Sequence, residues 1–367
     1  MEKLFEPITI GNLELKNRFM RSATWDATAD ETGAVTDMSV ELYQGLGEGE
    51  IGLIVSGFAF VSSHGQAIRA QYGIYADEMI PGLRRMAKAA QQDGTKVAAQ
   101  IVHAGIKSRF MSERGIQSLA MSYIPDNQQP HREMTEEDIE GIIDDFAAAA
   151  VRAREAGFDA IQIHGAHGYL LSQAESPLLN RRTDRWGGSP ENRRRFHLEV
   201  IRQVRKAIGD DFPLIIKFGV MDDQGGGLTL EEGIETARQM IAAGIEAIEV
   251  SAGDGQAILV AREGDPEQTP FRERAARLKN EVSVPVMLVN GIRTFETVKD
   301  IIESGDADMV SMCRPFVREP GLVVRWQRGE QAPATCISCG LCLHNAVRGE
   351  PMECYQDRRL TEEVSKQ

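Results

Sequence analysis

Short apolar runs alternate with longer amphipathic stretches along most of the chain. The short runs are apolar at nearly every position, which is typical of strands buried on both faces of a parallel sheet. Apolar residues in the longer stretches recur with the helical period. The predicted strands are residues 18–24, 51–61, 96–103, 160–165, 213–220, 247–253, 284–292 and 307–315. The predicted helices include residues 81–92, 136–156, 190–208, 230–243 and 295–303, with a weaker one at 37–45.

One local pattern recurs where a helix leads into a strand. Residues 155–165, 242–253 and 303–313 each end a helix near a glycine, add polar residues and continue as an apolar strand. Glycine suits this place because helices commonly end in one left-handed residue. Repeated units of this kind predict parallel strands covered by helices, and the strand count favours an α/β fold of the (β/α)8 TIM-barrel type. A doubly wound sheet is the alternative, although no GxGxxG motif follows a strand.

Segments outside the repeated units complete the predicted organisation. Residues 5–17 alternate apolar and polar positions about a Gly-Asn pair, which predicts an N-terminal β-hairpin. Residues 104–135 are long and polar, and we expect an active-site loop with little regular structure. We expect the barrel to occupy residues 1–318. Residues 319–367 are too few to bury a core of their own and form a C-terminal extension packed on the barrel.

Charge and composition exclude several classes of function. The chain has 41 basic and 55 acidic residues, a net charge of −14, which argues against nucleic acid or a membrane surface as partner because both are polyanionic. No apolar run is long enough to span a bilayer, and the N-terminus has no apolar signal-peptide core. Five cysteines in 367 residues do not make a disulfide framework. We therefore expect a cytoplasmic protein.

Polar rings crowd the end of the fourth predicted strand, where His164, His167 and Tyr169 follow one another closely. Enzymes built on parallel-strand barrels carry their chemistry at such strand ends. Residues three apart point to opposite faces of a strand, so the histidines converge only if the backbone turns at Gly165 or Gly168. A pair of structural loop histidines is one alternative. A zinc pair is another, but it lacks a third ligand nearby.

Features of a phosphate site follow the last two predicted strands, where barrels often bind phosphate. Gly291 permits close approach of the backbone, and Arg314 offers a forked cation. Gln100 and Lys217 lie in other strands, where a buried polar group needs a partner. Together these groups describe a cradle for a flat phosphorylated cofactor such as FMN. A lyase or isomerase acting on a phosphorylated substrate is the non-redox alternative.

Two long motifs resemble the Old Yellow Enzyme family of FMN-dependent oxidoreductases. They are HGAHGYLLSQ, from residue 164, and SPLLNRRTDRWGGSPENR, from residue 176; the opening LFEPITIGNLELKNR is also similar. The resemblance covers nearly the whole chain and implies a (β/α)8 barrel with FMN at its C-terminal mouth. It also implies NAD(P)H as co-substrate and an electron-poor alkene, an α,β-unsaturated carbonyl compound, reduced in a ping-pong cycle. A homo-oligomer is a further expectation.

The resemblance implies a role for each matching residue. His164 and His167 would bind the carbonyl oxygen of the substrate, and Tyr169 would donate a proton. Three departures concern Lys217, where many members have Arg, Cys313, where Gly is usual, and Trp25, where Thr or Cys is common. The residues expected to bind the cofactor are Ser22, Ala23, Thr24, Trp25, Gly57, Gln100, Lys217, Gly291, Cys313 and Arg314.

Four cysteines lie in one short C-terminal stretch. The first three are Cys336, Cys339 and Cys342, with two residues between each and the next. Eleven residues lie between Cys342 and the fourth, Cys354. Four thiolates suit a [4Fe–4S] cluster or tetrahedral zinc, and the three-plus-one spacing favours iron–sulfur because zinc sites more often use two CxxC pairs. The motif resembles the branch containing 2,4-dienoyl-CoA reductase and trimethylamine dehydrogenase, which are longer chains. Alternatives are free thiols, and an electron-transfer subunit that serves an external partner.

Overall fold

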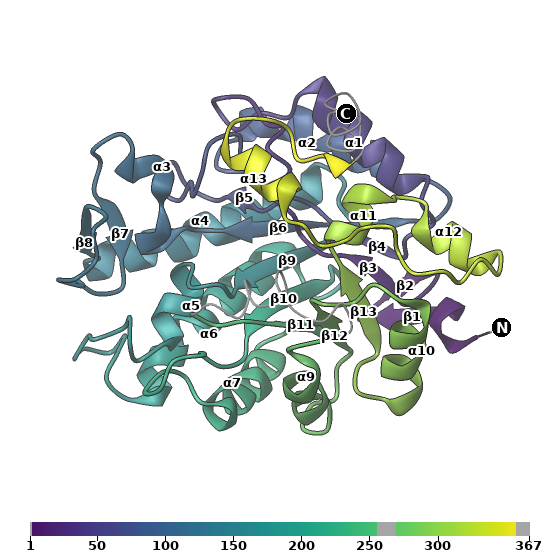
Figure 1. The fold of residues 1–367 in the computed structure, drawn as a ribbon. Helices are drawn as coiled ribbons and strands as arrows, with labels where there is room; N and C mark the ends of the chain where they lie inside the picture. The colour runs from purple at the N-terminus through teal and green to yellow at the C-terminus, as the bar shows by residue number, and fades with distance from the viewer. Residues whose placement is uncertain (1, 255–268, 357–367) are drawn as a thin grey trace, which may run out of the picture.

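The computed structural model describes residues 2–254 and 269–356, and its centre is a ring of parallel strands surrounded by helices (Figure 1). The ring closes because the first and last strands of the hydrogen-bonded order also pair with each other. The predicted (β/α)8 barrel is therefore confirmed. The order is β4 (Leu53–Val55), β3 (Phe19–Arg21), β13 (Met309–Met312), β12 (Val286–Val289), β11 (Ala247–Ser251), β10 (Leu214–Gly219), β9 (Ala160–Gly165) and β6 (Lys96–Val102).

All eight barrel strands lie within the runs predicted from the sequence, and β9 has the predicted bounds. The second run, 51–61, is broken into β4 and β5 (Ala59–Phe60). The break has a physical cause, since the Gly57 backbone N–H donates to Tyr43 Oη at 2.6 Å instead of entering the ladder. Beside the same break, Arg21 Nη1 donates a hydrogen bond to the Val55 carbonyl oxygen at 2.8 Å.

The helices begin at side chains that satisfy their free N–H groups. Thr36, Thr135 and Thr229 form capping boxes, and Ser189 caps the helix that starts at Pro190. Each predicted helix is present to within two residues at either end. The surrounding helices are α1 (Asp37–Gly47), α2 (Ile80–Ala90), α4 (Glu136–Glu155), α6 (Pro190–Ile208), α7 (Leu230–Ala242), α9 (Arg272–Lys279) and α10 (Phe295–Ser304).

The interior of the barrel changes from apolar to polar along the strands. The predicted hairpin, β1 (Ile8–Ile10) and β2 (Leu13–Leu15), places Ile10 and Leu15 in an apolar cluster with the first inward residue of several strands, Ala160 among them. Side chains alternate along a strand, so the next inward residues of β9 are Gln162 and then His164. The barrel thus carries its polar side chains towards the C-terminal ends of the strands.

The polar loop after β6 is more regular than predicted, so the expectation of little regular structure was wrong. It contains η3 (Gly105–Lys107), α3 (Arg109–Ser112) and the paired strands β7 (Ser118–Ala120) and β8 (His131–Glu133). The short helix α3 lacks an apolar periodicity and is stabilised instead by a side-chain cap, since Ser108 Oγ accepts a hydrogen bond from the Met111 N–H at 3.1 Å.

The segment after β13 first packs against the barrel core and then runs over the C-terminal ends of the strands. In α12 (Leu322–Gln327), the buried Trp326 ring lies 5.9 Å from Phe19 and 5.8 Å from Phe295, centroid to centroid. Further on, α13 (Leu341–Val347) lies over the barrel near α11 (Arg314–Arg318) (Figure 1). The rest of the predicted extension, 357–367, lies outside the described residues. None of the helices in the described part of the chain has the length and apolar content needed to cross a bilayer.

Candidate active site

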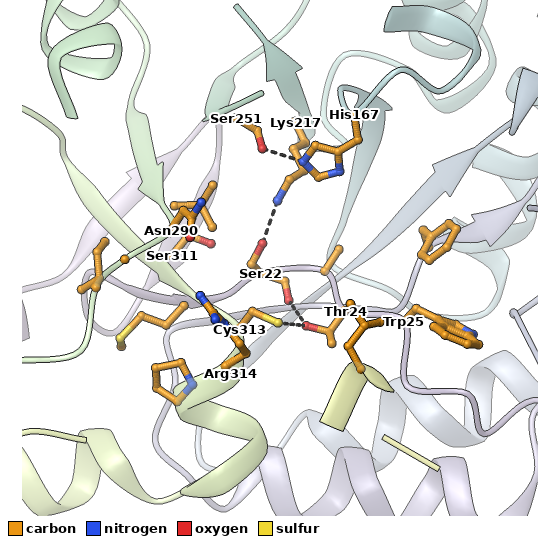
Figure 2. A pocket seen from close by; sticks show the side chains of 18 of the residues that line it. Ser22, Thr24, Trp25, His167, Lys217, Ser251, Asn290, Ser311, Cys313 and Arg314 are labelled. Atoms are coloured by element: carbon orange, nitrogen blue, oxygen red, sulfur yellow. Dashed lines mark hydrogen bonds between the residues drawn. The ribbon is translucent and has the colours of Figure 1, made fainter. Parts of the chain in front are cut away.

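A cavity of about 310 Å³ opens at the C-terminal ends of the barrel strands (Figure 2). It gathers almost all the side chains that the sequence proposed for a site, and they come from six of the barrel strands and the loops that follow them. The predicted residues that line it are Ser22, Ala23, Thr24, Trp25, Gln100, His164, His167, Tyr169, Lys217, Gly291, Cys313 and Arg314.

Gly57 is the predicted cofactor residue that does not line this cavity. It packs beneath the segment after β3, where an added Cβ would lie 2.9 Å from the Thr24 carbonyl oxygen. The small residue therefore lets two strand ends approach each other. A direct contact between Gly57 and a cofactor stays a prediction.

His164 and His167 converge because the chain turns immediately after β9. His167 has φ 63° and Gly168 has φ 68°, both in the left-handed region. Lys107 Nζ donates to the His167 carbonyl at 2.9 Å and helps hold the turn. The two imidazole centroids lie 5.0 Å apart with planes at 85°, and the ring of Tyr169 lies 5.1 Å from His164. The turn anticipated from the two glycines thus brings all three rings to one wall.

Burial keeps both imidazoles neutral. It lowers the pKa of His164 well below 6.5, and the nearby Lys217 lowers it further. Burial also lowers the pKa of His167, with His164 and Lys217 adding to the effect. His164 Nδ1 accepts from the Ala166 N–H at 3.3 Å, so the proton of the neutral ring is on Nε2. His167 Nε2 lies 2.7 Å from Ser251 Oγ (Figure 2).

Tyr169 remains a phenol over the whole physiological range of pH. Burial raises its pKa to about 12. Its ring packs 5.7 Å from Phe58, in an apolar cluster that Trp25 and Ile68 also contact. The site therefore presents two neutral imidazoles and one O–H donor to the same cavity.

Cationic side chains line the corner of the cavity between β12 and β13. Asn290 and Gly291 both have positive φ, 83° and 76°, which turns the chain sharply at the end of β12. Arg293 Nε and Arg314 Nη1 are buried and have no hydrogen-bond partner among the described residues. Two guanidinium groups with unused donors beside one cavity match the charge and geometry of a phosphate. Arg293 was missed as a site residue, although it follows the same strand end as Gly291.

Lys217 approaches the cavity from below, within a buried polar network. Its Nζ donates to Ser22 Oγ at 2.8 Å and to Glu249 Oε1 at 3.0 Å. Sequence analysis anticipated a partner for Lys217 but did not identify Glu249, which reads as one polar position in an apolar strand. Thr24 Oγ1 and Cys313 Sγ lie 2.9 Å apart on the opposite side (Figure 2).

The C-terminal extension supplies part of the cavity wall, which sequence analysis did not predict. Ser338, Gly340, Cys342, Leu343 and Met352 all line it. Met352 is held there by its backbone N–H, which donates to the carbonyl of Asp26 at 2.8 Å. A sequence pattern cannot show this contact because 325 residues lie between Asp26 and Met352.

The four clustered cysteines all line one small pocket that adjoins the cavity. Cys342 and Arg314 line both spaces. None of the cysteines forms a disulfide. In residues 2–254 and 269–356, no three His, Cys, Asp or Glu side chains already converge as metal ligands. The four thiols line one pocket, and the proposed ligand set stays a prediction.

Comparisons with known proteins agree with this geometry. A family model described as the NADH:flavin oxidoreductase / NADH oxidase family matches residues 3–332. The NADH oxidase of Thermoanaerobacter brockii is 36% identical over 351 residues, which make up 94% of this chain and 54% of that protein. The chain thus spans about half the length of this relative.

Solved structures share the fold over almost the whole chain. A complex of 2-naphthoyl-CoA reductase with 2-naphthoyl-CoA has a TM-score of 0.89 at 29% identity, covering 96% of this chain and 56% of that one. The old yellow enzyme homologue from Zymomonas mobilis has a TM-score of 0.77 at 27% identity, covering 91% and 94%. The chain therefore belongs to the NADH:flavin oxidoreductase / NADH oxidase family, the Old Yellow Enzyme family of FMN-dependent oxidoreductases.

Proposed function

We propose that this protein uses NAD(P)H to reduce the carbon–carbon double bond of α,β-unsaturated carbonyl compounds. The observation that supports this reaction is one cavity wall that joins two neutral imidazoles to a protonated phenol. A carbonyl oxygen needs neutral donors that stabilise its developing negative charge, and the α-carbon needs an acid. His164 and His167 supply the donors, and Tyr169 supplies the acid.

The rest of the cavity suits the cofactor of this family. FMN, when bound, supplies the hydride chemistry between NAD(P)H and the alkene. Arg293 and Arg314 would hold its phosphate, because each has a buried guanidinium donor that no described residue pairs with. Gln100 and Lys217 would meet the polar edge of the ring system from the barrel interior. Residues of the extension help exclude water, since Leu343 and Met352 cover the cavity with apolar groups.

A second cavity favours a substrate with an extended anionic part. This space of about 210 Å³ shares Trp25 with the main cavity. Among the described residues it is lined by three arginines and one acid: Arg69, Arg109, Arg348 and Glu113. A local excess of cations in a chain of net charge −14 would attract an anion. The structurally similar 2-naphthoyl-CoA reductase was solved with a CoA thioester. We infer that unsaturated acyl thioesters of CoA belong to the substrate class.

Anaerobic half-reactions test the proposed reaction. The purified protein should show a flavin spectrum that NAD(P)H bleaches and that an enone, such as 2-cyclohexenone, restores. A protein without a flavin spectrum would instead support a non-redox enzyme. A reduced flavin that no enone or enoyl thioester reoxidises would contradict the ene-reductase activity while leaving the flavin intact.

The thioester class has its own test. Arg348→Ala should raise KM for an enoyl-CoA and leave KM for 2-cyclohexenone unchanged, because only the first substrate reaches the second cavity. Arg328→Ala removes an exposed arginine outside this cavity and serves as the matched control. Equal effects of Arg348→Ala on both substrates would contradict the assignment.

The cysteine pocket supports a further proposal, an iron–sulfur cluster that exchanges electrons with an external partner. It rests on Cys342 and Arg314, which line both the pocket and the main cavity. A group held by the four thiolates would lie next to the phosphate corner of the flavin site. Iron and sulfide analysis of protein purified without oxygen tests this.

A further inference from the structure

Glu249 is a fully buried carboxylate in the barrel interior, directly below the cavity. It occupies an inward position of β11 between Ala247, in the apolar layer, and Ser251, which lines the cavity. Three groups donate to Oε1: Ser22 Oγ at 2.7 Å, Ser311 Oγ at 2.7 Å and Lys217 Nζ at 3.0 Å. Gln162 Nε2 donates to Oε2 at 2.9 Å. The proposed reaction assigns this residue no role.

The four donors keep Glu249 ionised. Burial alone would raise its pKa, but Lys217 and the hydrogen bonds from Ser22 and Ser311 hold the pKa below its ordinary value. An ionised carboxylate accepts hydrogen bonds and cannot donate one. Every neighbour of Glu249 must therefore turn a donor towards it.

This constraint passes through Gln162 to Gln100. Gln162 turns its amide nitrogen to Glu249, so its Oε1 faces Gln100, which must donate from Nε2, at 2.6 Å. The carbonyl oxygen of Gln100 is then left for the cavity that this side chain lines. The charge of Glu249 thus sets which end of Gln100 is presented two side chains away.

The same carboxylate orients Lys217. An ammonium group has three donors, and Lys217 uses one on Ser22 Oγ and one on Glu249. The third is left for the cavity, which Lys217 also lines. Figure 2 shows the Lys217 side chain directed at Ser22. The carboxylate also offsets the positive charge of this ammonium group.

We propose that Glu249 is a positioning residue for the pyrimidine edge of the bound flavin. It presents the Gln100 carbonyl and one Lys217 donor to that edge, and its charge lowers the flavin reduction potential. The pyrimidine edge carries an N–H between two carbonyl oxygens, so it needs one acceptor and flanking donors. A reduced flavin holds more negative charge, which a nearby carboxylate disfavours. The inference rests on the proposed binding of FMN.

Glu249→Gln in the FMN-loaded protein tests both parts of the role. The midpoint potential of the flavin should become more positive, because an anion is lost close to the ring. The dissociation constant of FMN should rise about tenfold or more, because the amide relay loses its fixed direction. Glu246→Gln is the matched control, since Glu246 lies three residues earlier and pairs with Arg205 outside the cavity.

Two further variants separate charge from orientation. Gln162→Met interrupts the relay without changing any charge, so it should weaken FMN binding and leave the potential at the wild-type value. Glu249→Gln combined with Lys217→Gln removes both charges and should return the potential towards wild type. A Glu249→Gln protein with unchanged potential and unchanged affinity overturns this inference alone. Wild-type protein that takes up no FMN overturns the proposed function as well.

Discussion

The imidazoles of His164 and His167 face one cavity 5.0 Å apart, although only two residues separate them in the chain. An extended strand would point them to opposite faces. The left-handed backbone of His167 reverses the second ring, and the Ser251 hydroxyl, 2.7 Å from Nε2, holds it there. When the Ser251 hydroxyl donates to Nε2, the neutral ring of His167 carries its proton on Nδ1, and the pair then offers two donors to one acceptor atom such as a carbonyl oxygen.

Both histidines should act as neutral donors, so alkene reduction should not follow an ordinary histidine titration. Burial lowers the pKa of His164 and His167 well below 6.5, and the neutral form persists above those values. The rate constant for reoxidation of reduced flavin by an enone should stay level between about pH 8 and 6, where an unperturbed histidine titrates. Stopped-flow measurements would check this. An inflection near pH 6.5 that disappears in His167→Asn would contradict it.

Tyr169→Phe should slow alkene reduction and leave flavin reduction by NAD(P)H unchanged. The pKa of Tyr169, raised to about 12 by burial, keeps its proton available for the α-carbon. Loss of a general acid typically costs about 10²–10⁴ in rate. Separate stopped-flow half-reactions measure the two steps. Tyr123→Phe is the control because Tyr123 is exposed and outside the cavity; equal slowing of both half-reactions would rule out the assignment.

Sequence periodicity predicted the barrel well because each strand is a local feature. The run at 160–165 is β9, and the rings that follow it do reach the cavity. Glu249 was missed for the opposite reason. One acid between Ile248 and Val250 looks like a solvated position, and only closure of the barrel shows that it faces inward.

The contribution of the C-terminal extension to the cavity wall could not be predicted from a sequence pattern either. Its residues reach the cavity through contacts with distant strands, such as Ala334 N–H to the Arg293 carbonyl at 2.8 Å. The boundary predicted at residue 318 lies at the end of α11. The next helix, α12, still belongs to the barrel core through Leu322 and Trp326. Those contacts depend on the completed barrel, which no local pattern contains.

Arg293→Ala and Arg314→Ala should each weaken FMN binding. Arg293 Nε and Arg314 Nη1 are buried beside the cavity at the ends of β12 and β13, and neither has a hydrogen-bond partner in the described part of the chain. A hydrogen bond to a charged group contributes about 1.5–3 kcal/mol, which corresponds to roughly a 10- to 100-fold higher dissociation constant. Recovery of flavin fluorescence during dialysis measures the loss. Arg328→Ala should retain FMN like wild type. Full retention of FMN in both cavity variants would contradict the assignment of the phosphate to Arg293 and Arg314.

The four clustered cysteines should bind iron and sulfide when the protein is expressed and purified without oxygen. Cys336, Cys339, Cys342 and Cys354 line one pocket, and no disulfide competes for their thiols. Cys339→Ser should lose the metal, because four thiolates complete a cage that three fill poorly. Cys313→Ser is the matched control, since Cys313 lies on the barrel side and outside this pocket. Metal and acid-labile sulfide analysis distinguishes the outcomes: iron with sulfide supports a cluster, zinc without sulfide indicates a structural site, and neither metal would leave four free thiols.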